Sequence, residues 1–337
     1  MSSERTTDLN ITNNNPKNNV NFIKSPLNYT GNKYRILNQI IKYFPKNQYS
    51  LLDLFCGGAT VGINANANKV YFVDNRKQII DLLNYLAKVD FNKFLLDVES
   101  LIKKYNLSYS AKFGYKFYKN NLQDTNPNNG LKKYNEIAFY KLREDYNSLK
   151  DKSTDKANKL LYLLMVYGFN NDIRFSNLGN FNLPVGKTDL NKNNINKINN
   201  YNLKISTFDY EFICDEFYSK NIYELAKTVD FVYMDPPYLI TTAVYNENNG
   251  WTTDLEYKLL DFLNYLIEIN KPFILSNVLE KRGKKNEPLS YWLYKNKDLI
   301  EVIDINYHYR SASYNKIDRN ASEREIIVYF KGGALEW

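Results

Sequence analysis

The sequence predicts an α/β protein in which a mostly parallel sheet, with helices on both faces, carries an inserted second domain. Short apolar runs of strand length alternate with longer amphipathic runs up to residue 105 and again after residue 203, which is typical of parallel sheets. Between these two parts, in residues 106–202, aromatic residues alternate with Lys and Asn, and turn-forming residues are frequent. The 337 residues can form one large domain or two.

The expected elements follow from the spacing of the apolar residues. Before the insert we expect a helix at 36–44, strands at 50–55 and 69–74, and helical sequence at 77–105. Within the insert, 158–169 is predicted to be an apolar helix and 190–202 a solvated helix or loop. After it we expect strands at 203–210, 229–235, 271–278 and 322–330, and a helix at 255–269. Residues 21–105 and 203–337 are thus assigned to the sheet domain, 106–202 to the insert and 1–20 to a disordered polar tail.

Composition limits the classes of function. The net charge of +8 and the pI near 9.0 suit a polyanionic partner, although an AT-rich genome that biases codon usage produces a similar excess of Lys and Asn. With no apolar run of membrane-spanning length and no signal-peptide core, the chain is expected to be cytoplasmic and not to bind membranes. The two cysteines are too few for a disulfide framework. The single histidine, His308, argues against a serine triad or a zinc hydrolase site, and we expect no metal.

A glycine turn follows the first predicted strand in LLDLFCGGATVG, residues 51–62. A strand, a glycine turn and a helix start allow the backbone to approach a ligand closely. Asp74 ends the next predicted strand, where an acid can accept hydrogen bonds from ribose hydroxyls. Together these features predict a nucleoside-binding crevice. The GxGxxG pattern of dinucleotide sites is absent.

A second turn, in FVYMDPPYL at 231–239, ends a buried-type strand with an acid, two prolines and a tyrosine. Because Pro236 and Pro237 remove backbone freedom, the Asp235 side chain and the Pro236 carbonyl become fixed hydrogen-bond acceptors. Two fixed acceptors beside the Tyr238 ring suit the exocyclic amine of a planar base. We therefore expect attack by such an amine on an electrophilic methyl group.

These motifs resemble those of the Dam-type, alpha-group N6-adenine DNA methyltransferases, with the likeness spread over about residues 22–330. LNYTGNKYRIL (27–37) resembles the family's N-terminal cofactor segment, LLDLFCGGA its acid–x–Phe–x–Gly–x–Gly motif with Ala59 in place of the last glycine, and DPPY its catalytic motif. The cofactor residues that the resemblance implies are Tyr29, Gly31, Lys33, Asp53, Phe55, Gly57, Asp74, Asp209, Tyr210 and Asp235. The implied catalytic residues are Asp235, Pro236, Pro237 and Tyr238. The fold it implies is a Rossmann-like methyltransferase sheet with an inserted, mainly helical DNA-recognition domain.

The insert contributes to the same resemblance. FNNDIRFSNLGNFNLPVGK (169–187) is similar to the signature of a β-hairpin that enters DNA near the target base. The DNA-contacting residues that the resemblance implies are Arg174, Asn182, Pro184 and Lys187 in this hairpin, and Arg310 and Arg319 nearer the C-terminus.

The resemblance implies methyl transfer from S-adenosylmethionine to the N6 amine of a flipped-out adenine within a specific short site of double-stranded DNA. We expect a monomer without a metal, acting in a restriction–modification system with a cognate endonuclease or as a solitary or phage methylase. GATC is the familiar target of the family, but the target of this chain stays open.

Other functions stay open at this point. N4-cytosine methylation in DNA uses a similar motif, usually with Ser in place of Asp235, and amine methylation of RNA or of protein glutamine usually has Asn there. A non-catalytic, cofactor-binding DNA module is the alternative outside the enzymes, and the intact Asp235 and Tyr238 argue against it. C5-cytosine chemistry requires a Pro-Cys nucleophile, which the chain lacks. Cys56 lies in the glycine turn and Cys214 is expected to be packed.

Overall fold

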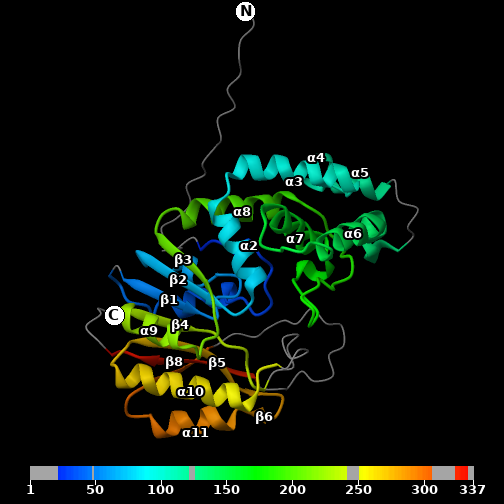
Figure 1. Ribbon diagram of the computed structural model, residues 1–337. Coiled ribbons are helices and arrows are strands. Elements are labelled where there is room, and N and C mark those ends of the chain that lie inside the picture. Colours follow the sequence, from blue (N-terminus) through cyan, green and yellow to red (C-terminus); the bar gives the residue numbers. More distant parts are fainter. Residues whose placement is uncertain (1–21, 48, 121–125, 241–249, 306–322, 333–337) are drawn as a thin grey trace, which may run out of the picture.

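The computed structural model describes residues 22–47, 49–120, 126–240, 250–305 and 323–332, and it confirms the α/β class (Figure 1). The strands are β1 (Ser50–Leu54), β2 (Lys69–Asp74), β3 (Asp209–Cys214), β4 (Phe231–Met234), β5 (Phe273–Lys281), β6 (Lys284–Lys285), β7 (Glu301–Asp304) and β8 (Glu323–Phe330). They form a sheet in the order β3-β2-β1-β4-β5-β8-β7, with β6 paired to β5. Strands β3, β2, β1, β4 and β5 are parallel, whereas β8 is antiparallel to β5 and β7.

Both faces of the sheet are apolar. In β1, Leu51 belongs to the core on one face, and Leu52 and Leu54 belong to the core on the other, as the two-residue period of a strand requires. We call the first face, which includes Tyr233 of β4, face A, and the second, which includes Met234, face B. Because strands buried on both sides need no polar positions, β4 is a continuous apolar run.

Face B is covered by α9 (Lys220–Thr228), α10 (Thr253–Glu268) and α11 (Glu287–Lys295). In α10, Leu259, Phe262, Leu263 and Leu266 recur at helical spacing and are fully buried, so one stripe of the helix packs on the sheet. The Thr252 hydroxyl caps α10 by accepting a backbone hydrogen bond from its first turn. Figure 1 shows α10 and α11 at one end of the molecule, near β5 and β8.

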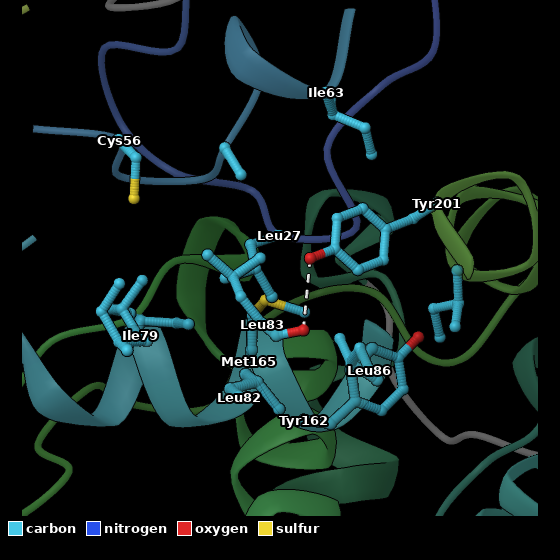
Figure 2. Packing of buried hydrophobic residues seen from close by; sticks show 14 of the residues in the cluster. Leu27, Cys56, Ile63, Ile79, Leu82, Leu83, Leu86, Tyr162, Met165 and Tyr201 are labelled. Atoms are coloured by element: carbon cyan, nitrogen blue, oxygen red, sulfur yellow. Dashed lines mark hydrogen bonds between the residues drawn. The ribbon is translucent and has the colours of Figure 1, made fainter. Parts of the chain in front are cut away.

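Face A is covered by α1 (Leu37–Ile41), α2 (Lys77–Lys88) and helices of the insert. Figure 2 shows Leu83 and Leu86 of α2 packed beside Tyr162 and Met165 from the insert. The Tyr201 hydroxyl donates a hydrogen bond to the Leu83 carbonyl at 3.2 Å. The insert and the sheet therefore share one hydrophobic core on this face.

The insert is mainly helical, as predicted. Its helices, with those at its borders, are α3 (Phe91–Tyr105), α4 (Ser110–Phe113), α5 (Tyr115–Asn120), α6 (Lys132–Asn147), α7 (Asp155–Tyr167) and α8 (Lys192–Ile205), with short 3₁₀ turns at 127–129 and 169–171. Two further 3₁₀ turns, at 34–36 and 62–64, belong to the sheet domain. Helices α3, α6 and α7 lie together, away from α10 and α11 (Figure 1). The predicted start of the insert coincides with the end of α3, whereas its predicted end at residue 202 falls inside α8.

Two expected elements differ from the structure. The helix expected at 36–44 ends at Ile41. The strand expected at 203–210 is wrong, because residues 203–205 complete α8 and β3 begins only at Asp209. The Asn-rich stretch 190–202, expected to be a helix or a loop, contributes most of its residues to helix α8, which Asn191 and Asn194 begin with a reciprocal capping box. None of the described helices has both the length and the apolar character needed to cross a membrane.

Candidate active site at the carboxyl ends of the strands

A cleft of about 640 Å³ lies at the carboxyl ends of β1, β2 and β4. Its lining residues lie within the segments 29–33, 53–61, 73–78, 172–182, 215–218, 233–238 and 250–255. Open parallel sheets bind ligands at this edge, and the volume is that of a small-molecule site. The cleft therefore joins the glycine turn, the DPPY turn and the predicted hairpin.

The glycine turn after β1 has an unusual backbone. Phe55, Gly57 and Ala59 have φ angles of 67°, 49° and 60°, in the left-handed region where non-glycine residues are strained and often functional. A side chain at Gly57 would lie 2.7 Å from the Tyr29 ring, so the glycine allows Tyr29 to cover the turn. Ala59 occupies the place where the resemblance expects a glycine, and its positive φ explains the preference for glycine there.

Two buried carboxyl groups hold the turn in place. Asp74 accepts hydrogen bonds from the backbone N–H groups of Gly57 at 3.1 Å and Arg76 at 3.0 Å. Asp53 accepts from the N–H of Gly62 at 2.9 Å. Burial raises the pKa of the Asp74 carboxyl, and it raises the pKa of Asp53 to about 8, with nearby carboxylates adding to the shift. The cleft thus concentrates carboxyl groups where water solvates them poorly, which favours a cationic ligand.

An aromatic wall made of Phe55, Phe217 and Trp251 lines one side of the cleft. Their ring centroids lie 5.0 to 5.7 Å apart, the spacing of packed aromatic pairs. The indole N–H of Trp251 donates to the buried Glu256 carboxylate, which also accepts from Asn286 at 2.7 Å. This anchored apolar surface suits a planar ring. Sequence reasoning missed Phe217 and Trp251.

The predicted adenine-binding pair, Asp209 and Tyr210, does not reach the cleft. Asp209 begins β3 and pairs with Lys69, at the far end of β2 from Asp74. Five residue-to-residue steps separate the two ends, which is roughly 16 Å at the rise of a parallel strand. The assignment is therefore corrected: the segment that leaves β3 beside Asp74 is 215–218, and it lines the cleft. The acid–x–aromatic pattern in CDEF, residues 214–217, was the feature of the sequence that could have identified this segment.

The position of Phe217 in the cleft leads to a testable prediction. Replacing Phe217 by Ala is expected to weaken cofactor binding about tenfold, because a ring that stacks on a base contributes on the order of 1–3 kcal/mol. Replacing Tyr210 by Ala serves as the control, since Tyr210 lies at the opposite end of the strand. Calorimetric titration of both variants with S-adenosylmethionine measures the effect. Weakened binding in Tyr210→Ala alone would restore the original assignment.

The DPPY turn forms a buried cluster with Lys33. The Lys33 ammonium, on a side chain only 3% exposed, lies 2.8 Å from Asp235 Oδ2 and 2.6 Å from the Tyr238 hydroxyl. The Tyr238 hydroxyl donates to Asp235 Oδ1 at 2.9 Å. Pro236 and Pro237 also line the cleft. Lys33, which the resemblance implied as a cofactor residue, thus has its ammonium on the catalytic-motif acid.

The N-terminal segment 29–33 connects the two halves of the cleft. Tyr29 covers the glycine turn, and Gly31 has a φ of +84°. Between them, the Thr30 hydroxyl donates to Asp172 Oδ2 at 2.9 Å. This hydrogen bond joins the predicted cofactor segment to the base of the hairpin.

Residues 168–186 fold back on themselves as an irregular hairpin, with isolated backbone bridges between 168 and 185 and between 175 and 181. The Arg174 guanidinium donates from Nε to Asn182 Oδ1 at 2.8 Å, and both residues line the cleft. Pro184 and Lys187 follow on the same arm and are exposed, outside the cleft lining. The structure brings two of these four predicted DNA contacts to the cleft.

The remaining predictions concern the two cysteines, the expected lack of a metal and residues near the C-terminus. Cys56 is buried, and burial raises the pKa of its thiol well above the ordinary value, so it is not a poised nucleophile. Cys214, which was expected to be packed, is exposed at the edge strand β3. His308, Arg310 and Arg319 lie outside the described residues. Within the described ranges, no group of three or more His, Cys, Asp or Glu side chains could hold a metal ion.

Comparison with known proteins gives related sequences. The modification methylase StsI of Streptococcus sanguinis is 34% identical over 333 residues, covering 95% of this chain and 46% of that protein. The type II methyltransferase M.FokI of Planomicrobium okeanokoites is 33% identical over 315 residues, covering 92% and 43%. The DNA adenine methylase of Escherichia coli (strain K12) is 24% identical over 255 residues, covering 74% and 79%. The chain spans about half the length of the first two relatives.

A family model adds to these similarities. The model of the D12 class N6 adenine-specific DNA methyltransferases matches residues 29–309, which include the glycine turn, the insert and the DPPY turn. The chain belongs to the D12 class of N6 adenine-specific DNA methyltransferases.

Proposed function

We propose that this chain transfers a methyl group from S-adenosylmethionine to the N6 amine of an adenine in a specific site of double-stranded DNA. The observation that carries the proposal is the geometry of Asp235 and Tyr238. Both residues follow β4 and line the same cleft as the glycine turn and Asp74. Family membership supports the choice of adenine.

The cleft fits the proposed cofactor on its own features. Because Gly57 has no Cβ, the Tyr29 ring can pack over the turn and line the cleft, and the carboxyl-rich lining favours a cation such as a sulfonium. Asp74 is placed to accept hydrogen bonds from a ribose, and Phe55 and Phe217 offer a surface for an adenine ring. When bound, S-adenosylmethionine supplies an electrophilic methyl group. Tyr29, Gly31 and Asp53 complete the residues that would hold it.

Asp235 and Tyr238 have to change partners before a base can bind. Both Asp235 oxygens are engaged, Oδ1 by the Tyr238 hydroxyl and Oδ2 by Lys33. When Tyr238 leaves Oδ1 to stack on an incoming base, that oxygen becomes an acceptor for an N6 hydrogen. Extruding the base from the duplex costs a few kcal/mol, which stacking on Tyr238 and bonding to Asp235 offset. The released N6 proton then has a carboxylate beside it.

Double-stranded DNA is proposed to lie along the hairpin, with Arg174 and Asn182 at the target base. Replacing Arg174 by Ala is expected to weaken binding to target DNA about tenfold, since one bidentate base contact is worth on the order of 1–3 kcal/mol. Lys227→Ala is the control, because Lys227 precedes β4 at the amino ends of the strands, away from the cleft. Fluorescence anisotropy with labelled duplexes measures both. Equal affinity of Arg174→Ala and wild type would remove Arg174 from the interface.

The proposed function is tested by methyl transfer from tritiated cofactor to duplex DNA, RNA and protein. Digestion of the labelled DNA to nucleosides identifies the product, and we expect N6-methyladenine. N4-methylcytosine as the labelled nucleoside would point to the related amine reaction on cytosine. Label in RNA or protein but never in DNA would refute the proposal.

The wider setting is also a proposal. We propose a cytoplasmic protein that acts as a monomer, in a restriction–modification system with a cognate endonuclease or as a solitary or phage methylase. The names of StsI and M.FokI support the first of these settings. Mapping modified bases in DNA from cells that express the chain would identify the target sequence.

A further inference from the structure

The Lys33 ammonium lies between two carboxyl groups on neighbouring parts of face A. One is Asp235, which follows β4, at 2.8 Å. The other is Glu325 of β8, whose Oε1 lies 3.9 Å from the ammonium nitrogen. The reaction described above uses Asp235 but gives no role to Glu325.

The Glu325 carboxyl group is buried but incompletely hydrogen-bonded among the described residues. Its side chain is 5% exposed, and its Oε2 has no hydrogen-bond partner among the described residues. Burying a carboxyl group without full hydrogen bonding costs free energy unless a nearby charge compensates. Glu325 lies opposite Val278 of β5 in the sheet. The ionisable groups that act on it are Lys33, Asp235, Glu323, Lys281 and Tyr233.

The hydrogen bonds of Lys33 indicate at which stage of the reaction Glu325 can act as its acceptor. An ammonium has three N–H donors, and here the acceptors are Asp235 Oδ2, the Tyr238 hydroxyl at 2.6 Å and the Gly31 carbonyl at 3.3 Å. Glu325 stands at 3.9 Å as the next acceptor in line. When Tyr238 moves onto a base, one N–H of Lys33 loses its acceptor, and Glu325 can take it.

We propose that Glu325 is a positioning residue for methyl transfer: acting through Lys33, its carboxylate holds the ammonium against Asp235 and balances its charge after Tyr238 has moved onto the target base. The inference rests on the proposed function. Without Glu325, Lys33 and Asp235 form a neutral pair whose carboxylate is a weaker hydrogen-bond acceptor. With Glu325 ionised, the three groups together carry one negative charge, which suits an amine that loses a proton as its new N–C bond forms.

The proposal has a pH signature. Burial raises the pKa of the Glu325 carboxyl to about 7, with the positive charge of Lys33 opposing the rise. A carboxyl with a raised pKa is protonated below that value, so the group of three becomes neutral as the pH falls through about 7. At saturating cofactor and DNA, the single-turnover rate of the wild type should therefore fall on the acidic side of neutrality.

Glu325→Gln tests the role, because glutamine keeps the shape and removes the charge. Its single-turnover rate above neutral pH is expected to be about tenfold lower than that of the wild type, with the decline below neutrality lost. Glu301→Gln is the matched control, because Glu301 lies on the neighbouring strand β7, is exposed and pairs with Lys331. A Glu325→Gln rate that keeps the wild-type value and pH profile overturns the proposal, as does a rate lowered equally at every pH.

A double-mutant cycle with Lys33→Met tests the route through Lys33. If Glu325 acts through Lys33, the losses in Glu325→Gln and Lys33→Met are not additive in the double variant. Additive losses overturn the proposal. If the wild type methylates RNA rather than DNA, the proposed function fails, and the same rates are compared on RNA.

The ionisation of the Glu325 carboxyl can also be measured directly, without catalysis. In protein labelled with ¹³C at the glutamate carboxyls, one resonance should titrate near neutrality and be absent in Glu325→Gln. Its midpoint should rise in Lys33→Met, because the cation that favours the ionised form is gone. An unchanged midpoint would show that Lys33 and Glu325 are not coupled.

Discussion

Asp235→Ala is expected to lower the rate of methyl transfer about 10³-fold while the protein still binds S-adenosylmethionine, since removing one fixed polar group from a reaction centre has effects of this size. The carboxylate at the end of β4 is the group proposed to accept the N6 hydrogen of the target base. The variant should still fold, because Lys33 keeps Glu325 as a counter-charge and the Gly31 carbonyl as an acceptor. The loss should therefore appear in the chemical step.

Single-turnover transfer from tritiated cofactor measures that step, and calorimetric titration measures cofactor affinity. The affinity should change less than about tenfold, which corresponds to about 1.4 kcal/mol. Asp298→Ala, an exposed acid after α11, controls for the loss of a negative charge. A variant that transfers methyl groups at the wild-type rate would remove Asp235 from the reaction.

Asp74→Ala is expected to have the opposite profile, with cofactor affinity weakened about 100-fold, because hydrogen bonds to a buried charged group are each worth on the order of 1.5–3 kcal/mol. In the structure the carboxylate accepts from the N–H groups of Gly57 and Arg76. Removing it takes away the proposed ribose acceptor and also the group that holds the glycine turn. Both losses act on cofactor binding before any chemistry.

The matched control is Asp81→Ala, on the neighbouring helix α2. Asp81 pairs with Lys77 on the helix surface, and such exposed pairs contribute little. The measurement is the dissociation constant of S-adenosylmethionine for each variant. At saturating cofactor, Asp74→Ala should recover much of its transfer rate, whereas Asp235→Ala should not. Loss of rate without loss of affinity in Asp74→Ala would contradict the assignment.

Sequence reasoning succeeded where the chemistry depends on neighbours along the chain. β2 and the Asp74 that ends it were expected as one strand and its terminal acid, and the structure has them there. The DPPY turn is equally local, because its rigid prolines and its two functional side chains are adjacent. The continuous burial of β4, which was expected to be a buried-type strand, also followed from a short window of sequence.

The prediction that Asp209 and Tyr210 hold the cofactor adenine failed because it placed β3 too early in the chain. Two stretches, TFDY and CDEF, lie at opposite ends of β3, and each places an acid near an aromatic residue. Which of them reaches the cleft depends on where the preceding helix ends. Because α8 continues to Ile205, the strand starts at Asp209 and its carboxyl end carries Phe217 to the site. The Asn-rich sequence was compatible with a helix or a loop, and it did not indicate that a helix would continue to Ile205.

The charge cluster around Lys33 could not be predicted from spacing. Lys33, Asp235 and Glu325 are brought together by β4, β5 and β8, which are neighbours in the sheet but distant in sequence. The two-residue period of a strand predicts that alternate residues of β8 point to the same face of the sheet. It does not predict that Lys33, which is distant in the sequence, lies between that face and Asp235.

The pairing of β1 with β4 has a consequence for how the protein is made. Leu51 pairs with Phe231, so the centre of the sheet joins segments about 180 residues apart, with the whole insert between them. During synthesis, β1 and β2 emerge long before β4, and until then one edge of β1 has no strand beside it. Such distant pairing slows folding and leaves apolar edges exposed to aggregation. Helices α2 and α7, which emerge earlier and pack together, can cover face A during that interval.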